Sequence, residues 1–158
     1  MALIRAVEAA APATGLNLKW PNDLLLGLGK LGGILLERSG DKIVAGFGVN
    51  LASAPELPDR PTAALSSVAL VSPEAFTPLL AAAFTRELER WRADFPALTA
   101  LWMESAHKIG SPMTAHSGPD ELLEGIFDGL EADGALRLRL GSGEIRVIRA
   151  ADVSLGTV

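Results

Sequence analysis

Three short segments in the first third of the chain combine turn-forming residues with polar side chains, and together they could line a pocket for an anionic ligand. Residues 18–25 read Leu-Lys-Trp-Pro-Asn-Asp-Leu-Leu, and residues 30–37 read Lys-Leu-Gly-Gly-Ile-Leu-Leu-Glu. Residues 46–51 read Gly-Phe-Gly-Val-Asn-Leu. The chemistry that these residue types offer is the binding of a carboxylate or phosphate by lysine and amide groups beside bare glycine backbone.

Lys19 is the leading candidate for a site residue in these segments. Alternation along a strand places Leu18 and Trp20 on one face and Lys19 on the other. If Lys19 faces a cavity, its ammonium supplies a compact positive charge and three donors for a carboxylate or phosphate; the alternative is a solvent-facing lysine on an edge strand. Asp23 is explained by turn chemistry, with pairing to Lys19 or to a metal as the alternative.

The glycine pair and Asn50 also allow two interpretations. At Gly32 and Gly33 a missing Cβ would let a flat ligand ring lie against the backbone, but such glycines are also typical of β-bulges. Asn50 could donate its amide to an anion or cap the loop that follows.

Composition excludes several classes of protein. The 158 residues are 49% apolar and 21% charged, which is ordinary for a globular protein. The net charge of −5 disfavours electrostatic binding of nucleic acid, although residues 1–52 alone sum to about +1. The absence of cysteine excludes disulfides and thiolate metal sites. The two histidines lack partners at ligand spacing, so no protein-held metal site is predicted.

Apolar runs are short throughout the chain. Arg5 and Glu8 interrupt the first one, and none approaches the roughly 20 residues that cross a bilayer. We therefore expect a cytoplasmic protein with no membrane partner.

The first part of the chain is predicted to alternate short strands with helices. Helical spacing covers residues 3–11, and strands are expected at 16–20, 24–26, 33–37 and 43–49. After a long connection, Thr77-Pro78 predicts a helix start. Its expected apolar face consists of Phe76, Leu80, Phe84, Leu88 and Trp91. A second helix is expected over residues 97–107.

The last part predicts a β-meander. Runs at 126–130, 135–140 and 145–148 are separated by glycine turns. The fold class is therefore α+β, with a mixed or antiparallel sheet and helices in residues 1–106, followed by a small SH3-like barrel in residues 107–158.

Taken in this order and spacing, the three segments resemble the catalytic domain of biotin–protein ligases. Residues 77–104 resemble the helical segment of that family, and residues 107–153 resemble its SH3-like C-terminal domain. A lipoate-ligase-like transferase shares the general fold, but the Lys-Trp-Pro-Asn-Asp and Lys-Leu-Gly-Gly strings favour biotin.

The resemblance implies a two-step reaction with biotin and ATP as substrates and Mg²⁺ shared mainly with the phosphates. Biotinyl-5′-adenylate forms first, and a lysine of a biotin carboxyl-carrier domain, as in acetyl-CoA carboxylase, is then modified. Lys19 would contact the biotin carboxylate and the adenylate phosphate. The pocket would be lined by Leu24, Gly33, Gly46, Gly48, Val49 and Asn50.

The family also places a Gly-Arg-Gly-Arg-x-Gly-Arg loop upstream of the first segment, and this chain holds only 18 residues before Lys19. We therefore expect part of an active site, a chain that is inactive alone, and uncovered sheet edges that favour a homodimer. The alternative is a non-catalytic remnant that binds a carrier or another protein.

Overall fold

The computed structural model describes residues 1–12, 15–116 and 121–155, and their contacts divide the chain into two units. The first unit comprises residues 1–18 and 22–98, and the second comprises residues 19–21 and 99–158. Three α-helices and two antiparallel sheets occur within the described residues, which confirms the α+β class. The expected domain boundary at residues 106 and 107 stays a prediction.

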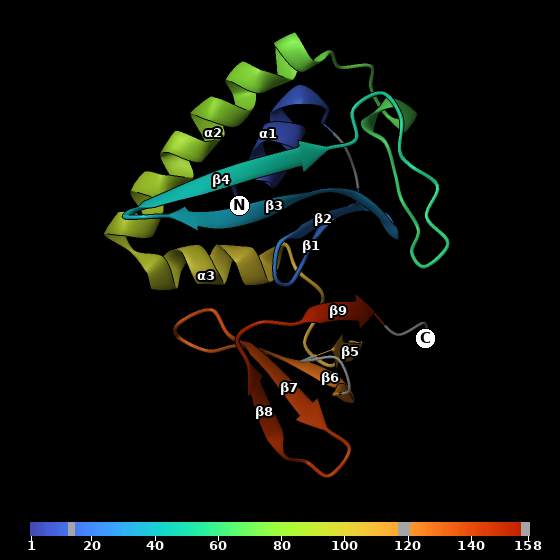
Figure 1. Cartoon of the computed structure of the whole chain (residues 1–158), viewed down its shortest axis with the longest axis vertical. Coiled ribbons are helices and arrows are strands. Elements are labelled where there is room, and N and C mark those ends of the chain that lie inside the picture. Colours follow the sequence, from blue (N-terminus) through green and yellow to red (C-terminus); the bar gives the residue numbers. More distant parts are fainter. Residues whose placement is uncertain (13–14, 117–120, 156–158) are drawn as a thin grey trace. The chain divides into compact units, whose positions relative to one another are not determined.

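The first unit is built on a four-stranded sheet. Strands β1 (Leu16–Lys19), β2 (Asp23–Leu26), β3 (Gly29–Ser39) and β4 (Lys42–Val49) lie in that order (Figure 1). The β3–β4 hairpin turns at Gly40, which has a φ of 60° that favours glycine. Its register places Gly33 opposite Gly48 and Leu35 opposite Gly46.

Two helices of the first unit pack against each other. Helix α1 (Ala2–Ala10) buries Leu3, Ile4 and Val7, and helix α2 (Pro73–Ala93) lies along it (Figure 1). Fully burying an aliphatic side chain of this size contributes about 1.5–3 kcal/mol, so α1 is held by its apolar face.

The predicted start of α2 at Thr77-Pro78 is wrong by about one turn. Ser72 caps the helix, its Oγ accepting from the amide of Ala75, and Pro73 occupies the first turn. Pro78 lies inside the helix, and the Thr77 hydroxyl donates to the carbonyl of Pro73. Both hydroxyl–proline pairs carry the same local signal, and the upstream pair begins the helix.

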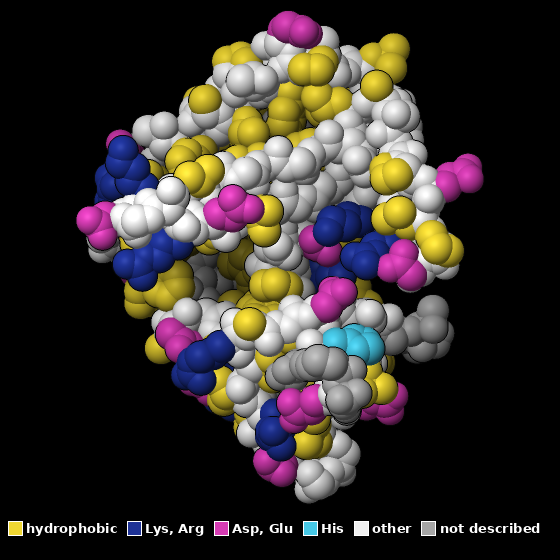
Figure 2. Space-filling view, viewed as in Figure 1, with side chains coloured by type: hydrophobic (Ala, Val, Ile, Leu, Met, Phe, Trp, Pro, Cys, Tyr) yellow, Lys and Arg dark blue, Asp and Glu magenta, His cyan; other side chains and the backbone are white. Residues whose placement is uncertain are grey.

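The predicted apolar face of α2 is only partly correct. Phe76 is buried as expected, but Phe84 and Trp91 are 38% and 53% exposed. The other buried residues of α2 are Ala83 and Glu87, and the small side chain of Ala83 allows close packing. Arg90 donates to Oε1 of the Glu87 carboxylate at 2.9 Å, whereas Oε2 is buried without a hydrogen-bond partner among the described residues. Figure 2 shows hydrophobic side chains on the surface between α2 and β4.

The second unit contains a five-stranded antiparallel sheet, which is compatible with an SH3-like domain. Strands β5 (Pro112–His116), β6 (Leu122–Leu130), β7 (Leu136–Leu140), β8 (Ile145–Ile148) and β9 (Asp152–Leu155) have the order β8-β7-β6-β5-β9. Helix α3 (Phe95–Glu104) contributes its residues up to Leu98 to the first unit and its residues from Thr99 to the second.

The core of the second unit includes a residue from far upstream. Trp20, which is 6% exposed, clusters with Phe127, Leu136 and Leu138, and its indole N–H donates to the carbonyl of Gly134 at 3.1 Å. The corner of residues 19–21, whose Trp20–Pro21 peptide is cis, therefore packs as part of this unit.

Arginines of β7 form an ionic network on β6. Arg139 and Arg137 both donate to Asp128, and Arg137 also pairs with Glu131 at 2.8 Å. Hydrogen bonds from Arg139 and then Arg137 lower the pKa of Asp128. In the part of the chain that the structure describes, no helix is both long and apolar enough to span a bilayer.

Candidate functional site

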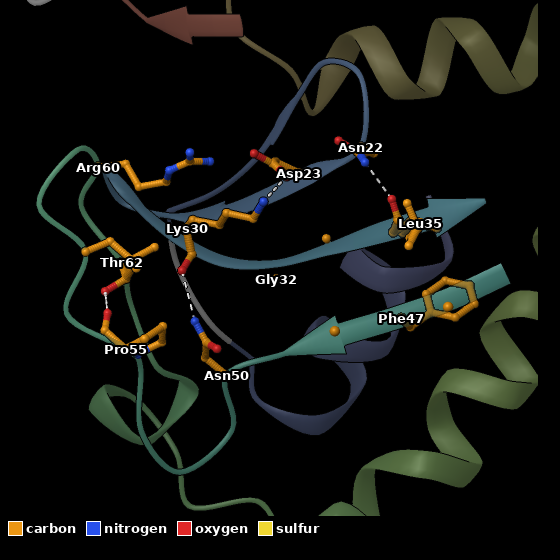
Figure 3. A pocket seen from close by; sticks show the side chains of 15 residues that line it. Asn22, Asp23, Lys30, Gly32, Leu35, Phe47, Asn50, Pro55, Arg60 and Thr62 are labelled. Carbon is orange, nitrogen blue, oxygen red and sulfur yellow. Dashed lines mark hydrogen bonds and ion pairs between the residues drawn. The ribbon is translucent and has the colours of Figure 1, made fainter. Parts of the chain in front are cut away.

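A cavity of about 560 Å³ lies in the first unit. Its lining comes from β2, β3, β4 and the connection between β4 and α2 (Figure 3). This volume falls within the usual range of small-molecule sites, roughly 300–1,000 Å³. Four predicted site residues line it: Gly33, Gly46, Gly48 and Asn50.

The three glycines among these residues share one face of the β3–β4 hairpin. Gly33 and Gly48 are directly opposite, and Gly46 lies two residues from Gly48, so all three face the same side. A Cβ built on Gly48 meets no atom within 4 Å, whereas a Cβ on Gly33 comes 3.1 Å from Asp23 Oδ1. The hairpin therefore presents bare backbone beside an ionic group, against which a flat ring could lie.

The ionic group is a pair formed by Asp23 and Lys30. Lys30 Nζ lies 2.6 Å from Asp23 Oδ1, and the Asp23 side chain is 7% exposed (Figure 3). Asn22, which precedes Asp23, anchors the turn by donating its amide to the carbonyl of Ile34 at 2.6 Å. The turn thus holds a buried carboxylate against a half-buried lysine, where electrostatic interactions are stronger than in bulk water.

Lys30 was not among the predicted site residues. It belongs to the second sequence segment, three residues before Gly33. A bulge at Leu24 and Leu25 shifts the β2–β3 register from Asp23↔Gly33 to Leu25↔Lys30. The lysine-to-glycine spacing was visible in the sequence, but the bulged β2–β3 register that brings Lys30 beside Asp23 was not.

Asn50 acts on the backbone of this site. Its side-chain amide donates to the carbonyl of Lys30 at 3.2 Å and to that of Ala63 at 3.1 Å. This arrangement matches the loop-capping interpretation, because the first contact fastens the β4–α2 connection to β3 and the second ties two parts of that connection together.

Lys19 does not line the cavity. It groups by its contacts with the second unit, where its positive charge adds to burial in lowering the pKa of His107. Among the described residues, His107 Nε2 is buried without a hydrogen-bond partner. Leu24 is 1% exposed within the first unit and Val49 is half-buried, and neither lines the cavity.

The cavity lining is suited to electrostatic binding and not to a protein-held metal cluster. No group of three or more His, Cys, Asp or Glu that could hold a metal occurs in the described ranges. The charged side chains in the lining are Asp23, Lys30 and Arg60. A single carboxylate with two cations favours an anionic ligand.

Comparisons with known proteins identify relatives of this chain. Residues 108–156 match the family model described as biotin protein ligase C terminal domain. A biotin–[acetyl-CoA-carboxylase] ligase of Paracoccus denitrificans is 40% identical over 94% of this chain. The ligase of the same description from Mycobacterium tuberculosis is 34% identical over 91% of the chain. A biotin protein ligase from Aquifex aeolicus, solved in complex with biotin and ATP, has the same fold, with a TM-score of 0.82 and 20% identity over 99% of this chain and 68% of that one.

The α+β architecture and these similarities define the class of protein. This chain belongs to the biotin protein ligase family. It spans 66% of the length of the Paracoccus relative and 54% of the Mycobacterium relative.

Proposed function

We propose that the first-unit cavity binds biotin and ATP for the biotinylation of a lysine on a biotin carboxyl-carrier domain. In the first step, a carboxylate oxygen of biotin bonds to the α-phosphorus of ATP and pyrophosphate leaves. In the second step, the amine of the carrier lysine bonds to the acyl carbon, the amine loses a proton, and AMP leaves. The curated relatives named as ligases and the Aquifex structure with biotin and ATP support this assignment.

The observation that carries the proposal is the bare hairpin backbone beside the Asp23–Lys30 pair. Gly33, Gly46 and Gly48 leave room for a ring system directly on the backbone. The Lys30 ammonium stands at the edge of that surface, where it can bind a carboxylate or phosphoryl oxygen. A fixed cation at this position stabilises the negative charge that develops on the phosphoryl group in the transition state.

Two lysines are thus candidates for the cation. Lys30 is favoured because it lines the cavity, and Lys19 is the alternative that the sequence motif suggests. Their methionine variants distinguish them. If Lys30 has this role, Lys30→Met weakens binding of a non-hydrolysable biotinyl-adenylate analogue by about tenfold or more, and Lys19→Met does not.

Magnesium fits the cavity as a partner of substrate phosphates. Mg²⁺ commonly binds through one or two carboxylates together with phosphate oxygens and water. Asp23 is the carboxylate in the lining that would hold it, and the ion would neutralise phosphate charge when bound. Lys30 holds that carboxylate in place.

We expect the chain to supply part of the active site, with the remainder built by sequence that the longer relatives hold outside the matched region. The relatives exceed this chain in length, which supports that expectation. A cavity that stays open to water weakens the electrostatic effect of Lys30, so activity of the 158-residue chain alone should be very low.

A homodimer through the β3–β4 hairpin is part of the same proposal. The outer half of the hairpin exposes Leu35, Leu36, Ile43 and Val44, each more than half exposed. Within the described residues β4 is an edge of the sheet, so a second copy could pair with it strand to strand. Sedimentation should show a dimer that Ile43→Lys dissociates, whereas a wild-type monomer at all concentrations would contradict it.

The central experiment combines calorimetry with an activity assay. The biotinyl-adenylate analogue is titrated into the chain, and transfer of labelled biotin to a carrier domain is measured with the chain alone and after addition of the unmatched part of the Paracoccus relative. We expect weak binding, no transfer alone, and transfer after the addition. Submicromolar binding by the chain alone would refute the partial site, and no detectable binding would refute the assignment of the cavity.

A further inference from the structure

A second cation, Arg60, reaches the cavity from the connection between β4 and α2. In Figure 3 its side chain extends from that connection over the cavity, in the direction of Asp23. The lining holds one carboxylate, Asp23, which pairs with Lys30, and a second cation, Arg60. In Figure 2 basic and acidic side chains gather where this connection meets the start of β3.

The backbone beside Arg60 is held firmly. The amide of Lys30 donates to the carbonyl of Pro61 at 2.9 Å, and the amide of Ala63 donates to the carbonyl of Lys30 at 2.9 Å. Thr62 forms a parallel bridge with Lys30, and its hydroxyl donates to the carbonyl of Pro55 at 2.6 Å. Arg60 therefore projects from a segment that is fastened to the same strand that carries Lys30.

The connection also lies too close to β3 for any side chain at Gly29. A Cβ built there would approach the backbone carbon of Thr62 to 2.7 Å. This close approach brings the residues around Thr62 against the cavity, and it gives Gly29 a steric role.

The guanidinium of Arg60 is held by a partner that an anionic ligand can replace. Its Nε and Nη2 donate to the same oxygen of Asp59, at 2.9 and 2.7 Å. The two side chains are 38% and 57% exposed, and exposed pairs of this kind contribute little to stability. The hydrogen bond from Arg60 lowers the pKa of Asp59, so the carboxylate remains ionised and positions the arginine at neutral pH.

We infer that Arg60 binds a phosphate of the nucleotide by exchanging Asp59 for phosphoryl oxygens, while Asp59 keeps the guanidinium near the cavity before binding. A planar guanidinium can donate two parallel hydrogen bonds to phosphate, which a lysine cannot. The assignment of this phosphate to ATP in biotin transfer rests on the proposed function, whereas the presence of a polyphosphate site is independent of that function.

The test measures the affinity of the 158-residue chain for ATP and for inorganic triphosphate. Each ligand is titrated to millimolar concentration, and binding is read from the amide chemical shifts in NMR spectra. The same spectra show that each variant is folded. Arg60→Gln should weaken both ligands about tenfold, and Arg60→Lys should weaken them less because charge is kept while the fork is lost.

Arg5→Gln is the matched control. Arg5 pairs with Glu8 at 2.8 Å with exposures of 36% and 41%, so the variant removes the same charge from a similar surface pair that does not line the cavity. We expect its affinity for triphosphate to match that of the wild type.

Each outcome decides the inference. Loss of triphosphate binding in Arg60→Gln but not in Arg5→Gln supports it, even where the biotinyl-adenylate analogue does not bind and the proposed function fails. Equal loss in both variants reflects general charge and overturns it. Unchanged affinity in Arg60→Gln, or no shifts with either ligand in the wild type, also overturns it, and analogue binding in that case leaves the proposed function standing.

Discussion

Alanine substitutions at Gly48 and Gly32 should have opposite effects on stability, although both glycines lie where β3 pairs with β4. At Gly48 a Cβ meets no atom within 4 Å, and the backbone φ is not positive. Gly48→Ala should therefore raise the free energy of unfolding of the first unit by about 0.4–1 kcal/mol, because the unfolded chain loses freedom. At Gly32 a Cβ would overlap the carbonyl oxygen of Gly48. Gly32→Ala should therefore lower the free energy of unfolding of the first unit by about 1–3 kcal/mol.

The same pair of variants tests the cavity. The new methyl group at Gly48 stands on the face that Gly33 and Gly46 share, so a ring lying on that backbone must move away. A steric misfit of about 1–3 kcal/mol corresponds to a loss of roughly 5- to 150-fold in affinity for the biotinyl-adenylate analogue. Gly48→Ala should thus be more stable than the wild type and bind more weakly.

Hydrogen exchange of the β3 and β4 amides measures the stability of the hairpin directly, and calorimetry or NMR titration measures the affinity. This combination separates a steric effect from unfolding, since unfolding would lower both quantities together. If Gly48→Ala binds the analogue as the wild type does, the ligand does not lie on the hairpin backbone and the proposed site is wrong.

Three further predictions concern the second unit. Trp20→Ala should lower its free energy of unfolding by about 3–5 kcal/mol in urea denaturation, whereas Trp20→Phe should lose mainly the hydrogen bond to Gly134, about 1 kcal/mol. Lys19→Met should raise the pKa of His107 in an NMR titration, because one of its two depressing influences is removed while burial remains; an unchanged pKa would contradict this. The folded-state pKa of Asp128 is lowered by the β7 arginines, so its stabilising contribution is present above the unfolded-state pKa of about 4 and is lost as pH falls through the folded-state value. Asp128→Asn should therefore flatten the acid limb of a plot of melting temperature against pH, and a limb as steep as in the wild type would argue against the network.

Much of the fold could be predicted because the strands are bounded by glycine turns. The strands expected at residues 33–37 and 43–49 lie within β3 and β4, and the strand at residues 145–148 is where the sequence indicated. The start of α2 was wrong because Ser72-Pro73 and Thr77-Pro78 carry equivalent capping signals, and local pattern does not decide between them.

Burial on α2 shows a second limit of sequence pattern. Periodicity identified an apolar stripe, but it did not identify which side of the helix α1 would cover. Ala83 is buried on α2, which packs along α1, while Trp91 is 53% exposed. Phe84 instead makes an edge-on contact with Phe47 of β4, with ring centroids 5.5 Å apart, a partner that is 37 residues away in the sequence.

The candidate site was also only partly predictable from the sequence. Gly33, Gly46 and Gly48 could be predicted by residue type, because a missing Cβ has a direct steric meaning. Lys30 and Arg60 could not be singled out, because their roles come from strand pairing and from the docking of a proline-rich connection. Charge and spacing in the sequence do not specify these long-range contacts.

The segment Lys-Trp-Pro-Asn-Asp at residues 19–23 has two structural roles that meet between Pro21 and Asn22. Residues 19–21 group with the second unit, whose core contains Trp20, while Asn22 and Asp23 line the cavity of the first. Variants on the two sides should therefore separate: Trp20 substitutions act first on the stability of the second unit, and Asp23 substitutions act first on the charge presented to a ligand. The dense clustering of polar and aromatic residue types in this one motif then reflects two structural roles that meet within five residues.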